Sequence, residues 1–139
     1  MQTGDAMARV YDKLSKEQRT AFNYALTYPE NEKRIHALED SRRAIRYDAD
    51  KVQTSGDSDP TFMIAVQIQR LKARNANIDD ALLDVFGTYG DQTVKVAKMM
   101  LCYGLKMAEA ESWFGRMAMN HNEYYRQRRN FWSVLSERI

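Results

Sequence analysis

Apolar side chains recur every three to four residues along most of the chain, and no long stretch alternates apolar and polar residues. The first pattern is typical of amphipathic helices, and the missing one is typical of strands. We therefore predict an all-α protein. A capping-box pattern of Ser15 and Gln18 marks the start of a first helix that runs to about Thr27. A second helix begins at Pro29, and its pattern ends near Tyr47.

A polar stretch over residues 48–58 interrupts the helical pattern. It has no apolar period, contains Gly56 and is rich in Asp and Ser, which together indicate a linker. We therefore expect an N-terminal helical region with its linker over residues 1–58 and a helical domain over residues 59–139.

The expected domain opens with two helices. Asp59 and Pro60 supply a favoured N-cap and first residue for a helix that ends near Asn75. A separate helix then runs from about Asn77 to the glycine-containing turn at residues 87–90. Asp91 is expected to cap the helix after that turn.

The last third of the chain, residues 92–139, shows three helical segments with short breaks between them. The first runs from about Gln92 to Tyr103 and the second from about Lys106 to Met117. The expected inward residues of these two helices are Val94, Ala97, Met100 and Leu101, then Met107, Ala110, Trp113, Phe114 and Met117. After a turn at Ala118-Met119, the sizes and order match a helix-turn-helix, in which one helix supports another that enters the DNA major groove.

The final helix, over residues 120–137, carries two distinct faces. Asn120 is a favoured N-cap, and Glu123 can complete a capping box with it. The residues expected to pack inward are Tyr124, Arg128, Phe131 and Leu135, with Trp132 widening the stripe. The complementary faces carry groups that can donate hydrogen bonds to base edges or phosphates: His121, Asn122, Tyr125, Arg126, Arg129 and Asn130.

Charge distribution matters more here than total charge. The formal net charge of +2 does not by itself indicate a nucleic-acid partner. However, residues 125–130 read YRQRRN, with three arginines and no acid. Charge alone would favour a solvated helix face, whereas the order of breaks, cap, inward aromatics and outward arginines favours a DNA-reading helix.

The remaining composition excludes several classes of protein. The hydrophobic fraction of 44% with 29% charged residues belongs to a soluble globular protein, and no apolar run is long enough for a membrane span. Without a signal-peptide pattern, we expect the cytoplasm as its location. The single cysteine, Cys102, excludes an internal disulfide and is expected to be a buried apolar residue.

Catalytic and metal-binding patterns are also missing. Neither His36 nor His121 has Cys, Asp or Glu at a zinc-site spacing, and no phosphate loop, nucleophile elbow or HExxH occurs. Asp79 and Asp80 are best explained as acids at the start of the helix expected from Asn77. We therefore expect no enzymatic activity, cofactor, metal or small-molecule substrate.

The segments IDDALLDVF, KVAKMMLCYGL and MNHNEYYRQRRNFWSVLSERI resemble phage transcriptional regulators of the ArpU and RinA type, whose C-terminal parts resemble region four of sigma factors. The segments TYPENEKRIHALEDSRRAI and SGDSDPTFMIAVQIQRL are similar to the N-terminal half of that family, so the resemblance covers Tyr28 to the end. By position, Met119-Asn120 corresponds to the entry of the family's recognition helix. Tyr124, Tyr125, Arg126 and Arg128 correspond to the tyrosine-arginine segment of that helix. The family usually has a small residue where this chain has Phe114, so the resemblance does not fix the crossing angle or the depth of groove insertion.

The resemblance implies activation of phage late genes through DNA upstream of their promoters, with host RNA polymerase as a candidate partner. We therefore expect a sequence-specific transcriptional regulator that binds double-stranded DNA as a homodimer in the bacterial host cell. Two alternatives stay open. One is a phage small terminase subunit, which would form a ring and act in DNA packaging; the other is a protein-protein interaction module that does not bind DNA.

Overall fold

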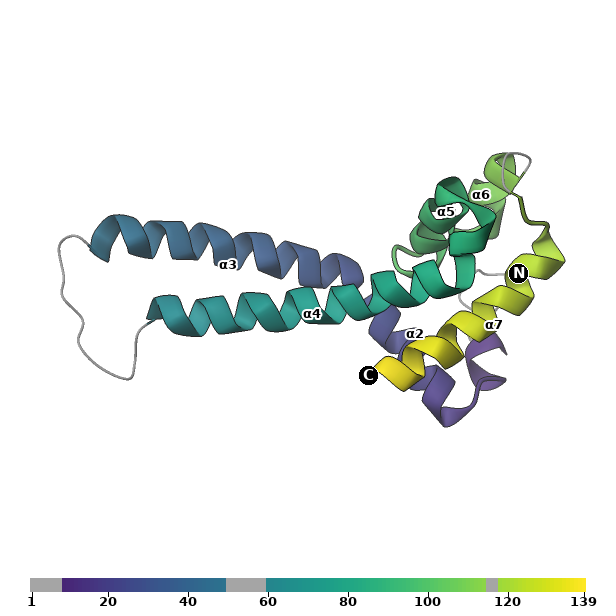
Figure 1. Cartoon of the computed structure of the whole chain (residues 1–139), viewed down its shortest axis with the longest axis horizontal. Helices are drawn as coiled ribbons and strands as arrows, with labels where there is room; N and C mark the ends of the chain where they lie inside the picture. The colour runs from purple at the N-terminus through teal and green to yellow at the C-terminus, as the bar shows by residue number, and fades with distance from the viewer. Residues whose placement is uncertain (1–8, 50–59, 115–117) are drawn as a thin grey trace. The chain divides into compact units, whose positions relative to one another are not determined.

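The computed structural model describes residues 9–49, 60–114 and 118–139, with only the backbone described for 46–49. Every regular element in these ranges is helical, which confirms the all-α prediction. In chain order they are α2 (Lys16–Leu26), α3 (Tyr28–Ala49), α4 (Pro60–Phe86), the 3-10 helix η1 (Gly87–Tyr89), α5 (Asp91–Leu101), α6 (Met107–Phe114) and α7 (His121–Arg138) (Figure 1). Residues 9–12 are also helical.

The described chain forms two compact units. One comprises Met1–Tyr28 with Asn77–Ile139, and the other comprises Pro29–Ala76. These units do not coincide with the domains expected from the sequence, which divide at residues 58 and 59. That expected boundary, most of the linker and Asp59 lie outside the described residues.

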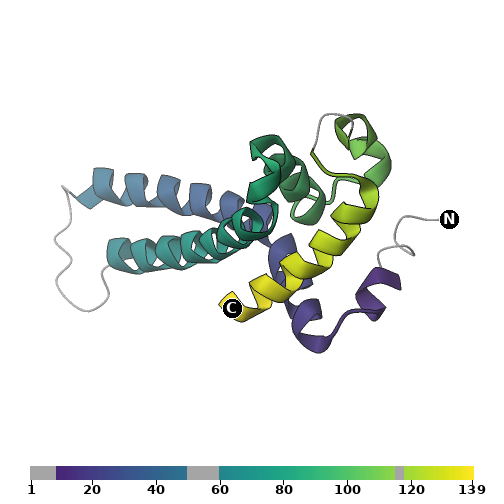
Figure 2. The ribbon, with the colours of Figure 1, turned by 45° about the vertical axis from the view of Figure 1, so that its right-hand side comes forward.

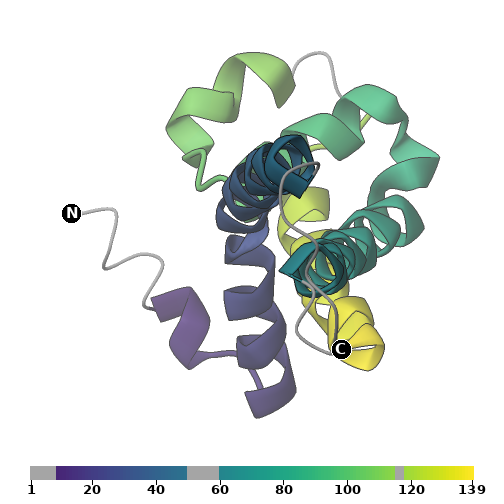
Figure 3. The same cartoon turned by 90° about the vertical axis from the view of Figure 1, so that its left-hand side faces the viewer.

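The unit of residues 29–76 is built from α3 and the first part of α4. The two helices run in opposite directions (Figure 1), and they lie side by side, as Figure 3 shows in a view nearly along their axes. The Asn31 side-chain amide donates a 2.9 Å hydrogen bond to Asn75 Oδ1, and Lys72 Nζ lies 3.5 Å from Glu39 Oε1. A buried amide pair and a partly exposed ion pair thus link the two helices.

Helix α4 is continuous from Pro60 to Phe86, so the two separate helices predicted on either side of Ala76 are wrong. The prediction placed the end of one helix near Asn75 and the start of the next around Asn77, two residues with low helix propensity. In the structure Asn75 is buried and hydrogen-bonded to Asn31. Because its polar side chain is satisfied by another helix, it does not compete with the backbone and the helix continues through it.

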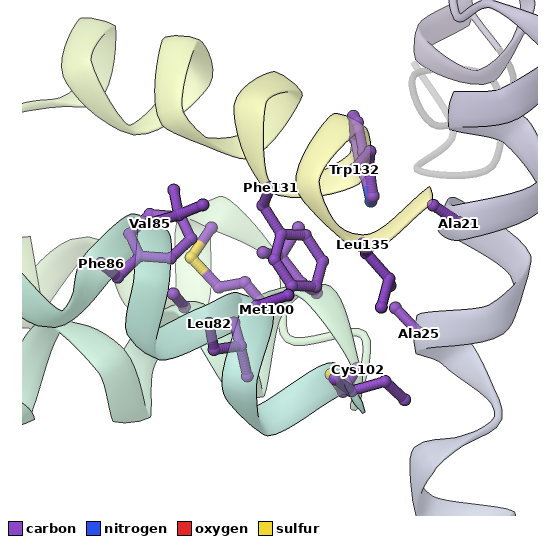
Figure 4. Close-up of a cluster of buried hydrophobic side chains, with 14 of the residues drawn as sticks. Ala21, Ala25, Leu82, Val85, Phe86, Met100, Cys102, Phe131, Trp132 and Leu135 are labelled. Atoms are coloured by element: carbon purple, nitrogen blue, oxygen red, sulfur yellow. The ribbon is translucent and has the colours of Figure 1, made fainter. Parts of the chain in front are cut away.

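The other unit, which includes α7, has its core between α7, α2, α5 and the last part of α4. Helix α7 packs along α2 (Figure 2), a pairing of segments that lie more than 90 residues apart in the sequence. In Figure 4, Leu135 of α7 points toward Ala25 of α2, while Phe131 points toward Leu82 and Met100. All five side chains are buried, so α7 is held on two sides.

The described ends of α2, α5 and α6 can be compared with the sequence prediction. Ser15 and Gln18 form the predicted capping box, with both reciprocal bonds at 3.1 Å. Asp91 is not a cap but the first residue of α5, because the preceding Gly90, at a φ of 104°, takes the N-cap position. Helix α6 has Phe114 as its last residue, and the predicted inward Met117 lies outside the described residues.

Candidate nucleic-acid interface

Helix α7 starts where the sequence predicts. Asn120 is its N-cap, and the Asn120 side chain accepts a 2.9 Å hydrogen bond from the backbone N–H of Glu123. Only this half of the expected capping box is formed, since no reciprocal bond joins the Glu123 side chain to the Asn120 backbone amide. One bond is enough to place an N-cap of the favoured type at the helix start.

The inward face of α7 agrees with the prediction in four of its five residues. Tyr124, Phe131, Trp132 and Leu135 are at most 2% exposed. Trp132 packs on Phe22 of α2 with ring centroids 5.2 Å apart, and Tyr124 stacks on Phe86 at 6.2 Å. The Gln18 side chain also donates a 2.8 Å hydrogen bond to Ser133 Oγ. The packing partners of α7 therefore include α2 and α4, neither of which belongs to the helix-turn-helix expected over residues 92–139.

The outward face of α7 carries five of the six predicted DNA-contacting residues. Asn122, Tyr125, Arg126, Arg129 and Asn130 are all exposed. Asn130 Nδ2 donates a 3.3 Å hydrogen bond to Gln127 Oε1. In the described part of the chain, neither the Arg126 nor the Arg129 guanidinium forms an ion pair or hydrogen bond. Two cations on one helix face are therefore available to an external anion.

His121, the sixth predicted residue, is engaged within the fold. Its Nε2 lies 3.0 Å from Glu111 Oε1, and its ring packs edge-on against Phe114 with centroids 4.5 Å apart. These contacts join the start of α7 to α6. His121 thus positions the helix, and it is less available to DNA than the sequence suggested.

Arg128, predicted to pack in the inward stripe, is only partly buried. Its guanidinium carbon lies 5.0 to 5.8 Å from the ring centroids of Tyr124, Tyr125 and Trp132. Burial lowers the pKa of Arg128, and the positive charge of Arg129 acts in the same direction. Arginine nevertheless stays charged in proteins, so a cation lies among aromatic rings beside the core.

The two helices before α7 are present, with one side chain placed differently from the prediction. Ala97, Met100, Leu101 and Ala110 are buried as expected. Trp113, predicted to face inward, is 39% exposed. The neighbouring residue Phe114 packs on α7, with its ring against those of His121 and Tyr124.

A polar cluster that the sequence did not predict links Tyr28, Asp79 and Lys98. Lys98 Nζ lies 2.6 Å from Tyr28 Oη and 2.9 Å from Asp79 Oδ1, and Tyr28 Oη donates to Asp79 Oδ2 at 3.0 Å. Partial burial by itself lowers the pKa of Lys98, but the two hydrogen bonds and the Asp79 charge raise it above its ordinary value. Asp79 therefore serves a tertiary ion pair, and the explanation by a helix start is wrong because α4 is continuous there.

The described ranges also bear on metal-binding groups, thiol chemistry and membrane-spanning helices. Among those residues, no group of three or more His, Cys, Asp or Glu side chains is placed to hold a metal ion. Cys102 is buried, as predicted, and burial raises the pKa of its thiol to about 12. Within the same ranges, no helix is both long enough and apolar enough to cross a membrane.

The comparisons with known proteins give no relative. No protein-family model matches the chain, and no curated protein or solved structure is significantly similar to it. The resemblance to phage regulators of the ArpU and RinA type therefore stays a prediction.

Proposed function

We propose that this protein is a sequence-specific DNA-binding transcriptional regulator and that α7 is its recognition helix. The observation that carries the proposal is the contrast between the two faces of α7. The inward aromatic residues are buried, whereas Arg126 and Arg129 lie exposed on the other side without an internal partner. A firmly held helix with free guanidinium groups can meet a polyanion in a fixed orientation.

The physical chemistry of α7 suits duplex DNA. The major groove is about 12 Å wide and admits one helix, and arginine can bind guanine O6 and N7 with two hydrogen bonds. Asn122 and Asn130, exposed on the same helix, carry amides of the kind that bind adenine. An RNA duplex offers no such site, because its base edges lie in a deep and narrow groove.

The finer form of the proposal is an activator of phage late genes with host RNA polymerase as its partner. A single helix-turn-helix module binds weakly, so we propose a homodimer that reads two half-sites. The mass of the native assembly tests this, because a stable ring of eight or more copies would favour DNA packaging instead.

The direct experiment selects the fragments of the encoding genome that the full chain binds and then measures binding to the selected duplex. Alanine at Arg126 or at Arg129 is expected to weaken binding by about 1–3 kcal/mol without changing helix content. Arg74→Ala is the matched control, because Arg74 is an exposed arginine outside α7. Equal binding by the Arg126, Arg129 and Arg74 variants would contradict the assignment of the interface.

A protein-binding module is the second candidate. Met99, Tyr103 and Trp113 are 44%, 40% and 39% exposed and line one apolar groove on α5 and α6. Exposed apolar side chains that cluster in this way often mark a protein-protein contact. If the protein acts only through this groove, it will not bind duplex DNA, even at low salt concentration where electrostatic binding is strongest.

A further inference from the structure

A cavity lies between α2, the connection from α5 to α6, and α7. Its volume is about 310 Å³, and its walls are mostly apolar, formed by Phe22, Leu26, Leu105, Tyr124 and Trp132 among others. Small-molecule sites in proteins begin at about this size and have a similar composition, with a few polar groups that fix the ligand's orientation. The volume suits a ligand of about one ring with a short side chain.

The polar groups of this cavity have one sign of charge. Arg128 and Lys106 line it, and no Asp or Glu does. Arg128 forms no ion pair with any described residue, and its Nε is buried without a hydrogen-bond partner. No other buried side-chain nitrogen or oxygen of the described residues lacks a partner in this way.

The aromatic rings around Arg128 compensate this charge only in part. Cation-π contacts with Tyr124, Tyr125 and Trp132, at 5.0 to 5.8 Å, stabilise the cation but use none of its N–H donors. A planar guanidinium binds a carboxylate through two parallel hydrogen bonds, which are stronger than those to a neutral acceptor. A carboxylate in the cavity would therefore supply the counter-charge that the Arg128 guanidinium lacks among the described residues.

We propose that this cavity binds a small monocarboxylate with an apolar body. The carboxylate contacts the Arg128 guanidinium at the wall, and the apolar body lies against Phe22, Leu26 and Leu105. This site is separate from the outward arginines of α7, so it does not depend on whether the protein binds DNA.

The test uses phenylacetate and its neutral isostere phenylacetamide as probes of the full chain, with isothermal titration calorimetry as the readout. We expect saturable binding of phenylacetate, about tenfold or more tighter than that of phenylacetamide. The Trp132 indole N–H signal in the NMR spectrum is expected to shift on binding, since Trp132 lines the cavity.

Two variants assign the binding to Arg128. Arg128→Met keeps an unbranched side chain about as long as the arginine stem but removes the guanidinium group, and it is expected to abolish the preference for phenylacetate while keeping weak binding of phenylacetamide. Arg126→Met, the same substitution at an exposed position of the same helix, is expected to leave both affinities unchanged.

Three results would overturn the proposal. They are no saturable phenylacetate binding to the folded chain, equal affinities for the two probes, or equal losses in the Arg126 and Arg128 variants. The first two need only the unaltered chain, so the proposal stays testable even where Arg128→Met does not fold. A fourth result would also overturn the proposal: if inorganic phosphate, titrated in parallel, binds as tightly as phenylacetate, the site does not need an apolar body in its ligand.

Discussion

The packing of α7 on α2 gives the prediction that the structure supports in most detail. Leu135 is 0% exposed, and it faces Ala25, which is also fully buried. Removing the Leu135 side chain beyond Cβ would leave a cavity between two helix backbones that cannot easily move together. Substitutions of this kind cost roughly 2–5 kcal/mol, and we expect Leu135→Ala to lower the free energy of unfolding by about 3 kcal/mol.

The matched control is the same substitution at Leu83, which is 56% exposed on α4. Leu83→Ala changes helix propensity by the same small amount but opens no cavity, so its effect should stay within about 0.5 kcal/mol. Leu135→Met keeps most of the volume and should cost less than about 1.5 kcal/mol. Urea unfolding followed by circular dichroism and tryptophan fluorescence measures all three. If Leu135→Ala and Leu83→Ala lower stability equally, α7 is not packed as described.

Three further predictions concern single sites. Burial raises the pKa of Cys102 from 9.0 to about 12, so its alkylation at about pH 8 should be slower in the folded than in the urea-unfolded chain by about three orders of magnitude; equal rates would contradict its burial. Lys98→Met should lower the free energy of unfolding by on the order of 1 kcal/mol at neutral pH, a value that already allows for solvent screening of the partly exposed ion pair. Because the folded pKa of Lys98 is raised above 10.5, this difference in urea stability should persist below that pH and disappear as the pH rises further, and a constant difference would contradict the ion pair. Asn120→Ala should lower stability by about 0.5–2 kcal/mol through the lost cap, whereas Asn122→Ala, at an exposed position beside it, should not.

Features set by neighbours in the sequence could be predicted from it. The capping box at Ser15, the N-cap at Asn120 and the buried stripe of Tyr124, Phe131 and Leu135 all depend on residues within a few helical turns of one another. Their positions follow from helix periodicity and from the hydrogen-bonding needs of helix ends.

Features set by distant segments could not be predicted in the same way. The continuity of α4 depends on Asn31, which satisfies Asn75 from another helix 44 residues away. The position of α7 depends on its packing against α2, and no periodic pattern in the sequence shows which two amphipathic helices will pair. Arg128, which lacks an ion-pair partner among the described residues, could not be recognised for the same reason, since the cavity beside it is lined by segments that lie far apart in the sequence.

The central claim is that Arg126 and Arg129 face a phosphate-bearing duplex, and the salt dependence of binding tests it most directly. The affinity for a selected duplex is measured across a range of salt concentrations for the full chain and for the double Arg126→Gln, Arg129→Gln variant. Each lost phosphate contact should reduce the slope of log affinity against log salt by about 0.9, so two lost contacts should reduce it by about 1.8. A variant with the same affinity and the same slope as the full chain, or an affinity of the full chain that does not change with salt, would contradict the account.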